Sequence, residues 1–167
     1  MGTRDRPREW PRRYPCNGDR VLGKVAAMDR RIQVTFDAAD PHALARWWAN
    51  ALHYEIEDCR DLVAGLLADG VVAEPDVLRL DGRLFFADAV AASDPQAAGP
   101  RLYFQRVPEP KTAKNRMHLD VPVDADQLDD EVERLRASGA TLTGFNAYPG
   151  HRAALLRDIE GNEFDLH

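Results

Sequence analysis

The segment RLYFQRVPEPKTAKNRMHLDVPVD, residues 101–124, decides the fold because it contains two strand patterns separated by a proline-bracketed connector. In residues 101–107 and 116–123, apolar and polar side chains alternate, which is typical of strands buried on one face. Proline has no amide hydrogen to donate to a sheet, so Pro108 and Pro110 are expected to end the first strand. The predicted apolar face consists of Leu102, Phe104, Met117, Leu119 and Val121.

The composition is typical of a globular protein. A chain of 167 residues is long enough for one ordinary domain or for two small fused modules. With 44% hydrophobic and 30% charged residues it is not expected to be disordered, and it has no apolar run of about 18 residues that would span a membrane. Cys16 and Cys59 are too few for a disulfide framework, so we expect a protein of the reducing cytoplasm.

The net charge of −6 is unevenly distributed. Residues 1–27 carry seven Lys or Arg against three acids and are rich in proline, which predicts a basic, weakly ordered N-terminal tail. The remainder carries 15 basic and 25 acidic residues. An acidic body argues against nucleic acid and membranes as partners, and it favours a neutral or cationic small molecule.

The two halves of the sequence resemble each other. Residues 32–40 (IQVTFDAAD) match residues 117–125 (MHLDVPVDA) in pattern at an offset of 85 residues. Each stretch precedes an amphipathic helix pattern, at residues 41–52 and 126–138, and further strand patterns follow. The sequence therefore predicts two similar modules, each of one strand, one helix and several further strands.

The predicted boundaries follow from this repeat. The first module covers residues 28–107 and the second covers residues 115–167. The first is longer, and a helix pattern at residues 61–69 predicts that the extra length is a helical insertion near residues 61–99. The end of that insertion, residues 89–99, is expected to be a loop.

A candidate metal site follows if both modules fold alike, because their first and last strands then line one concave surface. Aligning the halves places Gln33 opposite His118, and Gln105 opposite Asp165. A neutral imidazole, a carboxylate and amide oxygens are able to hold a borderline divalent ion. The alternative is that His118 is a structural residue of its strand, because only one imidazole and one carboxylate are strong ligands in this set.

The chain also resembles the vicinal oxygen chelate superfamily, specifically its glyoxalase-like and bleomycin-resistance-like proteins. The resemblance lies in IQVTFDAADP with ALARWWANALHY, in LYFQRVPEPKTAKNRMHLDV, in EVERLRASGAT and in RDIEGNEFDLH. The last segment resembles the family signature D-P-x-G-N-x-[apolar]-[acid], with Ile159 in place of proline. The resemblance implies an α+β fold in which two βαβββ modules form a curved mixed sheet around a cleft, known as the glyoxalase/bleomycin resistance/dihydroxybiphenyl dioxygenase fold.

The resemblance also implies a metal centre and a homodimer. Carried over by motif, the ligand positions are Gln33, Gln105, His118 and Asp165, and the ion is Zn, Ni, Co, Mn or Fe. Gln105 stands where glyoxalase I enzymes have a carboxylate, and Asp165 is one methylene shorter than their glutamate. As an enzyme, the protein is expected to be a lyase or isomerase whose ion polarises a carbonyl or enediolate oxygen while Asp120 or Glu163 moves a proton.

Two alternatives to the enzyme remain open. The first is a metal-free, drug-binding protein that sequesters a cationic ligand between anionic and aromatic side chains. These candidate ligand contacts are Asp37, Asp120, Asp165, Tyr103, Trp47 and Trp48. The second alternative is an interaction module whose cleft has lost its function.

Overall fold

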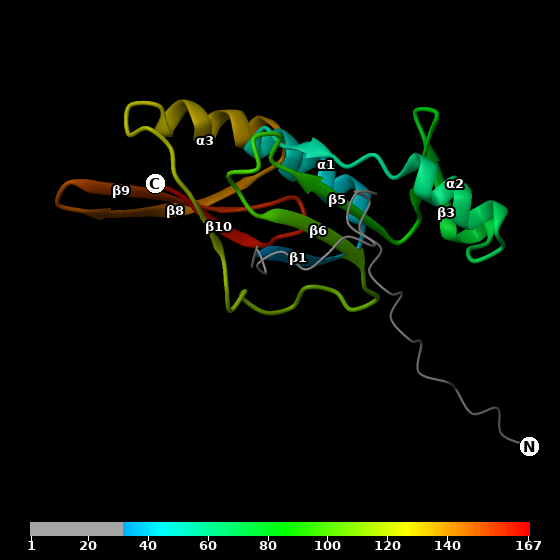
Figure 1. Cartoon of the computed structure of the whole chain (residues 1–167). Helices are drawn as coiled ribbons and strands as arrows, with labels where there is room; N and C mark the ends of the chain where they lie inside the picture. The colour runs from blue at the N-terminus through cyan, green and yellow to red at the C-terminus, as the bar shows by residue number, and fades with distance from the viewer. Residues whose placement is uncertain (1–31) are drawn as a thin grey trace, which may run out of the picture.

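The computed structural model describes residues 32–167, which form an α+β fold (Figure 1). The predicted tail of residues 1–27 lies outside the described residues. Among the helices of residues 32–167, none combines the length and the apolar character needed to cross a membrane.

The elements of the first half are β1 (Gln33–Ala38), α1 (Pro41–Leu52), β2 (Glu55–Ile56), α2 (Arg60–Ala68), the 3-10 helix η2 (Glu74–Asp76), β3 (Val77–Leu80), β4 (Arg83–Phe86), β5 (Ala89–Ser93) and β6 (Arg101–Arg106). Those of the second half are β7 (Leu119–Val121), α3 (Leu128–Ala137), β8 (Thr141–Tyr148), β9 (His151–Arg157) and β10 (Glu163–Leu166).

The two halves have the same topology. The first forms a four-stranded sheet in the order β1-β6-β5-β2, and the second forms one in the order β7-β10-β9-β8. In each sheet the first and last strands of the half are parallel neighbours, and the other pairs are antiparallel. The predicted pair of βαβββ modules is confirmed.

The insertion in the first half is shorter than predicted. It comprises α2, η2, β3 and β4, and Figure 1 shows it projecting from one end of the first sheet. Residues 89–93, which were expected to lie in a loop, form the inner strand β5. Alanine has a low strand propensity, so the sequence AVAAS gives a weak local signal. Ala91 and Ala92 are almost completely buried in the sheet, which shows that tertiary packing overrides that propensity.

Helix α1 begins and ends where the sequence predicts. The side-chain oxygen Oδ1 of Asp40 accepts hydrogen bonds from the amides of His42 and Ala43, each at 3.1 Å, and Pro41 occupies the first turn. Trp48 packs against Phe36 of β1 and against Phe164 of β10, with ring centroids 5.3 and 5.1 Å apart. One helix therefore contributes to a hydrophobic core that both modules share.

The turn after β9 connects the second module to the first. The Glu160 carboxylate accepts the amides of Ala39 and Asp40 at 2.9 and 2.8 Å. The buried carboxylate of Asp158 accepts the indole N–H of Trp48 at 3.0 Å. These contacts fix α1 and the end of β1 relative to the second sheet.

Strand β7 is shorter than the predicted strand at residues 116–123. Its parallel ladder with β10 begins at Leu119 opposite Phe164, and β10 itself has only four residues. Met117 therefore lies outside the ladder and is 85% exposed, so its predicted place on the apolar face is wrong. The residues before Leu119 belong to the connector that crosses the second sheet.

Candidate metal and ligand site

Three side chains from β7, β10 and the end of the connector meet on one face of the second sheet. Asp120 of β7 lies directly opposite Asp165 of β10 in the parallel register, and His118 precedes Asp120 by two residues on the same face. One potential ligand atom from each of the three lies within 4.8 Å of the other two. His118 Nδ1 and Asp120 Oδ1 are hydrogen-bonded at 2.8 Å.

This set of donors fits a divalent cation. Two carboxylates balance the charge of the ion, and imidazole with carboxylate is a common ligand combination for Zn, Mn, Fe, Co and Ni. Ligand atoms at about 2.1 Å from one ion lie at most about 4.2 Å apart, so small side-chain rotations close the remaining gap. His118 Nδ1 and Asp120 Oδ1 are 2.8 Å apart, close to the spacing of about 3.0 Å between two ligand atoms at 90° around one ion, so the ion would replace the hydrogen bond between them.

A cavity of about 560 Å³ lies over the same face of the second sheet. Its walls come from the connector, from β8 to β10 and from the turn between β9 and β10. The lining residues are Lys111, Thr112, Ala113, Lys114, His118, Thr143, Asn146, Leu155, Leu156, Arg157, Glu160, Gly161, Glu163 and Asp165. The cavity therefore contains two of the three candidate ligands and belongs to the second module and the connector, not to a cleft lined by both modules.

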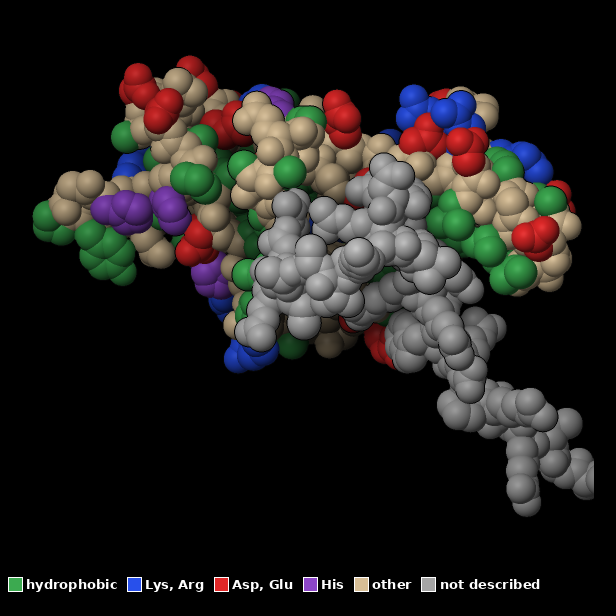
Figure 2. Space-filling view, viewed as in Figure 1, with side chains coloured by type: hydrophobic (Ala, Val, Ile, Leu, Met, Phe, Trp, Pro, Cys, Tyr) green, Lys and Arg blue, Asp and Glu red, His purple; other side chains and the backbone are tan. Residues whose placement is uncertain are grey.

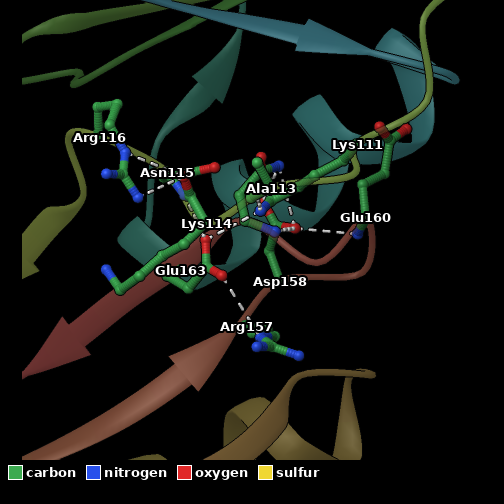
Figure 3. A network of polar contacts seen from close by, with 10 residues as sticks. Lys111, Ala113, Lys114, Asn115, Arg116, Arg157, Asp158, Glu160 and Glu163 are labelled. Atoms are coloured by element: carbon green, nitrogen blue, oxygen red, sulfur yellow. Dashed lines mark hydrogen bonds and ion pairs between the residues drawn. The ribbon is translucent and has the colours of Figure 1, made fainter.

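Glu163 attaches the connector to β10. Its Oε2 accepts the amide of Asn115 and the ammonium of Lys111, each at 3.0 Å, and its Oε1 lies 3.7 Å from Nε of Arg157. Figure 3 shows the Glu163 carboxylate between the connector and Arg157. The amide of Asn115, with the Lys111 ammonium, lowers the pKa of Glu163 to about 2. Glu163 is consequently a weak base that suits a structural role, whereas Asp120 is the carboxylate beside the candidate metal site.

Replacing Glu163 by glutamine is expected to loosen the connector, because the charge that binds Lys111 is lost. The folded-state pKa of about 2 lies below the ordinary 4.5, so this carboxylate stabilises the fold above pH 4.5 and the contribution disappears as the pH falls toward 2. The difference in unfolding free energy between wild type and Glu163→Gln should therefore shrink between pH 5 and pH 3 in urea titrations. A difference that stays constant over this range would contradict the assignment.

The two predicted glutamine ligands are engaged elsewhere. Gln33 Oε1 accepts a hydrogen bond from Arg101 Nη1 at 2.5 Å, and Gln105 Nε2 donates to Asp37 Oδ1 at 2.8 Å. Gln33 lies opposite Arg101, and Gln105 lies opposite Asp37, so the two amides are four residues, about 13 Å, apart along the β1–β6 pair. Neither lines the cavity. Of the four predicted ligands, the structure brings together His118 and Asp165.

The strand registers explain why the predicted equivalence of Gln105 with Asp165 is wrong. In the second module Asp165 lies opposite Asp120, whereas in the first module Tyr103 lies opposite Thr35. Thr35 is the residue equivalent to Asp120 at the offset of 85, so the counterpart of Asp165 is Tyr103. Alternation repeats every two residues, and a shift of two therefore leaves the polar pattern unchanged.

The predicted ligand contacts are dispersed. Trp47 lies in the shared core, where its indole N–H donates to the carbonyl of Ser138 at 3.1 Å, so it is not available for stacking on a ligand. Tyr103 is buried with Ala89 and Ala91 on the other face of the first sheet. Asp37 is exposed and bound to Gln105. None of these three predicted contacts lines the cavity.

Gln33 in the first module lies beside an ion pair between Arg101 and Glu57. Arg101 forms a two-pronged ion pair with Glu57, from Nε to Oε1 at 2.7 Å and from Nη2 to Oε2 at 2.8 Å. Glu57 is only 8% exposed, and its pKa is lowered by Arg101 and by the hydroxyl of Ser93 against the effect of burial. The guanidinium charge beside Gln33 disfavours a cation at that position.

The cations in the cavity wall could not be predicted from the sequence. Lys111, Lys114 and Arg157 line it, although the chain as a whole is acidic. Lys111 and Lys114 lie in the connector between prolines and strand, where no periodic pattern assigns a direction to a side chain.

The family follows from a sequence comparison. Residues 33–167 match the model of the family described as glyoxalase-like domain. The match covers nearly all of the described chain, and the protein belongs to this family. A comparison with curated proteins finds no match.

Several solved structures share the fold at low sequence identity. A mutant of the fosfomycin resistance protein FosX from Listeria monocytogenes, complexed with Mn(II) and 1S,2S-dihydroxypropylphosphonic acid, is 13% identical, with a TM-score of 0.56 over 84% of this chain and 92% of that one. FosX from Mesorhizobium loti is 15% identical, with a TM-score of 0.55 over 84% and 91% of the two chains. A glyoxalase/bleomycin resistance protein/dioxygenase family enzyme from Burkholderia phytofirmans PsJN is 16% identical, with a TM-score of 0.54 over 80% and 94%. At these identities the likeness establishes the fold.

Proposed function

We propose that the protein binds a divalent metal ion through His118, Asp120 and Asp165 and uses it to bind, and to act as a lyase or isomerase on, a small carbonyl compound in the adjoining cavity. The observation that carries this proposal is the convergence of the three potential ligand atoms within 4.8 Å, beside a cavity of about 560 Å³. The FosX complex with Mn(II) supports it as a related fold that holds a metal.

The charges of the cavity favour a ligand with an anionic group. Of the three acids in its wall, Glu163 is bound to Lys111, Glu160 accepts backbone amides of the first module, and Asp165 is a proposed ligand of the ion. Lys114 has no acidic partner among the described residues, and Arg157 approaches Glu163 only at 3.7 Å. A cationic drug would meet these charges unfavourably, which argues against the sequestering alternative.

The proposed roles of the ion and of the residues around it follow from the contacts of those residues. When bound, the ion would polarise a carbonyl or enediolate oxygen of the ligand. His118 would ligate the ion through Nδ1 and Asp120 through Oδ1, in place of the hydrogen bond that joins these two atoms. The Asp120 oxygen that does not ligate the ion would move a proton, and Lys114 would orient the anionic end of the ligand.

The proposal is tested by elemental analysis of protein purified from medium supplied with Mn, Fe, Co, Ni or Zn in turn. With Mn we expect one equivalent in wild type and none in Asp165→Asn, and with the other metals one equivalent fewer in Asp165→Asn than in wild type. Metal-loaded protein is then screened for thermal stabilisation by small carboxylates and phosphonates that carry a carbonyl or hydroxyl group. Protein that retains no metal under any of these conditions, or a response to cationic ligands alone, would contradict it.

A further inference from the structure

A pair of histidines lies where β9 begins and β10 ends, and His167 is two residues from Asp165 of the candidate site. His151 is the first residue of β9 and His167 directly follows β10, and their ring centroids are 5.5 Å apart. We infer that His151 and His167 form a second cation site, for a borderline divalent metal such as Ni²⁺, Zn²⁺ or Cu²⁺. The inference goes beyond the proposed function and uses none of its residues.

The separation of the rings suits a single ion. A metal–nitrogen bond of about 2.0–2.1 Å puts each ring centroid about 3.2 Å from the ion. Centroids 5.5 Å apart then subtend an angle of about 120° at the metal, which is close to the tetrahedral value. The two imidazoles are therefore close enough to share one ion once their nitrogens are turned toward it.

The nitrogens of both rings are available. Within residues 32–167 neither imidazole has a hydrogen-bond partner, and both residues are exposed. The neighbouring cation is directed elsewhere, because Arg152 Nη1 contacts Asp129 at 2.8 Å and its guanidinium lies 4.2 Å from the centre of the Phe145 ring. A metal at the pair therefore displaces no protein contact of these rings and does not face the charge of Arg152.

The backbone on both sides of the pair is fixed. The amide of His167 donates to the carbonyl of Val121 at 3.1 Å, and its carbonyl accepts the amide of Val123 at 2.7 Å. His151 pairs with Tyr148 across the β8–β9 hairpin. Figure 2 shows histidine side chains gathered on the surface where Figure 1 places β9 and the end of the chain. Preorganised ligands lose little conformational entropy when the ion binds.

The two sites differ in the metals that they favour. Two imidazoles suit Cu²⁺, Ni²⁺ and Zn²⁺, whereas the set His118, Asp120 and Asp165 contains two carboxylates and also suits Mn²⁺. Wild type is therefore expected to bind two equivalents of Ni²⁺ but one of Mn²⁺.

The test is isothermal titration of the full chain, prepared without a polyhistidine tag, with Ni²⁺ and with Mn²⁺. His151→Ala and His167→Ala should each lose one equivalent of Ni²⁺ and leave Mn²⁺ binding unchanged. Asp165→Asn should lose the Mn²⁺ equivalent and retain the Ni²⁺ equivalent of the histidine pair. Both histidines are exposed, so far-UV circular dichroism should show that the variants fold as wild type does.

Each result has a defined meaning. Ni²⁺ stoichiometry that is unchanged in both histidine variants would overturn the inference, as would wild type that binds one equivalent and loses it in Asp165→Asn. If Asp165→Asn still binds the one equivalent of Ni²⁺ that wild type binds, and His151→Ala binds none, the result would support the second site and contradict the first. With one Cu²⁺ bound to Asp165→Asn, electron paramagnetic resonance should show two nitrogen ligands, and one in the double variant Asp165→Asn/His167→Ala.

Discussion

Replacing Asp158 by alanine is expected to lower the free energy of unfolding by about 3 kcal/mol. The carboxylate is 3% exposed and accepts hydrogen bonds from the indole of Trp48 at 3.0 Å and from Asn162 Nδ2 at 2.9 Å. It also accepts the amides of Glu160 and Asn162, each at 2.9 Å. Alanine leaves the buried indole N–H of Trp48 and the half-buried donors of the turn without this acceptor, and a buried unsatisfied group costs about 1–3 kcal/mol.

The position of Asp158 makes the effect large. It orders the turn that carries Glu160, and Glu160 in turn accepts the amides at the end of β1 and the start of α1. Loss of the carboxylate therefore weakens the junction between the modules as well as the turn itself. A domain of this size has about 5–15 kcal/mol of stability in total, so the variant is expected to be markedly less stable.

Urea denaturation followed by tryptophan fluorescence measures the effect. Asp158→Asn keeps one oxygen acceptor and should be less destabilised than Asp158→Ala. Asp126→Ala, an exposed acid outside the helices, is the control and should stay within about 0.5 kcal/mol of wild type. An Asp158→Ala protein as stable as wild type would show that these contacts contribute little to the junction.

Replacing His118 by alanine is expected to weaken binding of Mn²⁺ by at least about 100-fold, or about 2.7 kcal/mol. Loss of an outer-shell partner alone costs about 10- to 100-fold in metal affinity, and His118 is the only imidazole of the three-residue set. His118 is exposed, so its removal should not unfold the protein. The comparison is made by titration of metal-free wild type and variant under the same conditions.

Gln105→Ala and Gln33→Ala are the matched controls. Both positions are ligands according to the family resemblance, but in the structure Gln33 is bound to Arg101 and Gln105 to Asp37. Both variants should therefore bind Mn²⁺ with an affinity within about twofold of wild type. A loss at either glutamine as large as that at His118 would show that the bound ion draws its ligands from both modules.

The comparison of sequence with structure shows which features local pattern encodes. Helix α1 could be predicted to the residue because Asp40 and Pro41 mark its start and because Leu44 and Trp48 repeat at helical spacing. The pairing of His118 with Asp165 could be predicted because the first and last strands of a repeated module are neighbours.

Other features depend on contacts that no local pattern encodes. Gln105 was aligned with Asp165 because a register shift of two residues preserves the alternation of polar and apolar side chains. Only the observed pairing of Gln105 with Asp37 distinguishes the two registers. Strand β5 was missed because its stability comes from burial of alanines. The connector was predicted to join two strands, but its place in the cavity wall was not predicted. That place depends on the hydrogen bond from Asn115 of the connector to Glu163, which is 48 residues away in the sequence.

The most direct test of the metal site is anomalous diffraction from crystals of the full chain grown with Mn²⁺. A divalent ion coordinated by His118, Asp120 and Asp165 would give an anomalous peak about 2.0–2.3 Å from the ligand atoms, at the edge of the cavity beneath the connector. No peak there at saturating Mn²⁺, or a peak bound by Gln33 and Gln105 instead, would contradict the account.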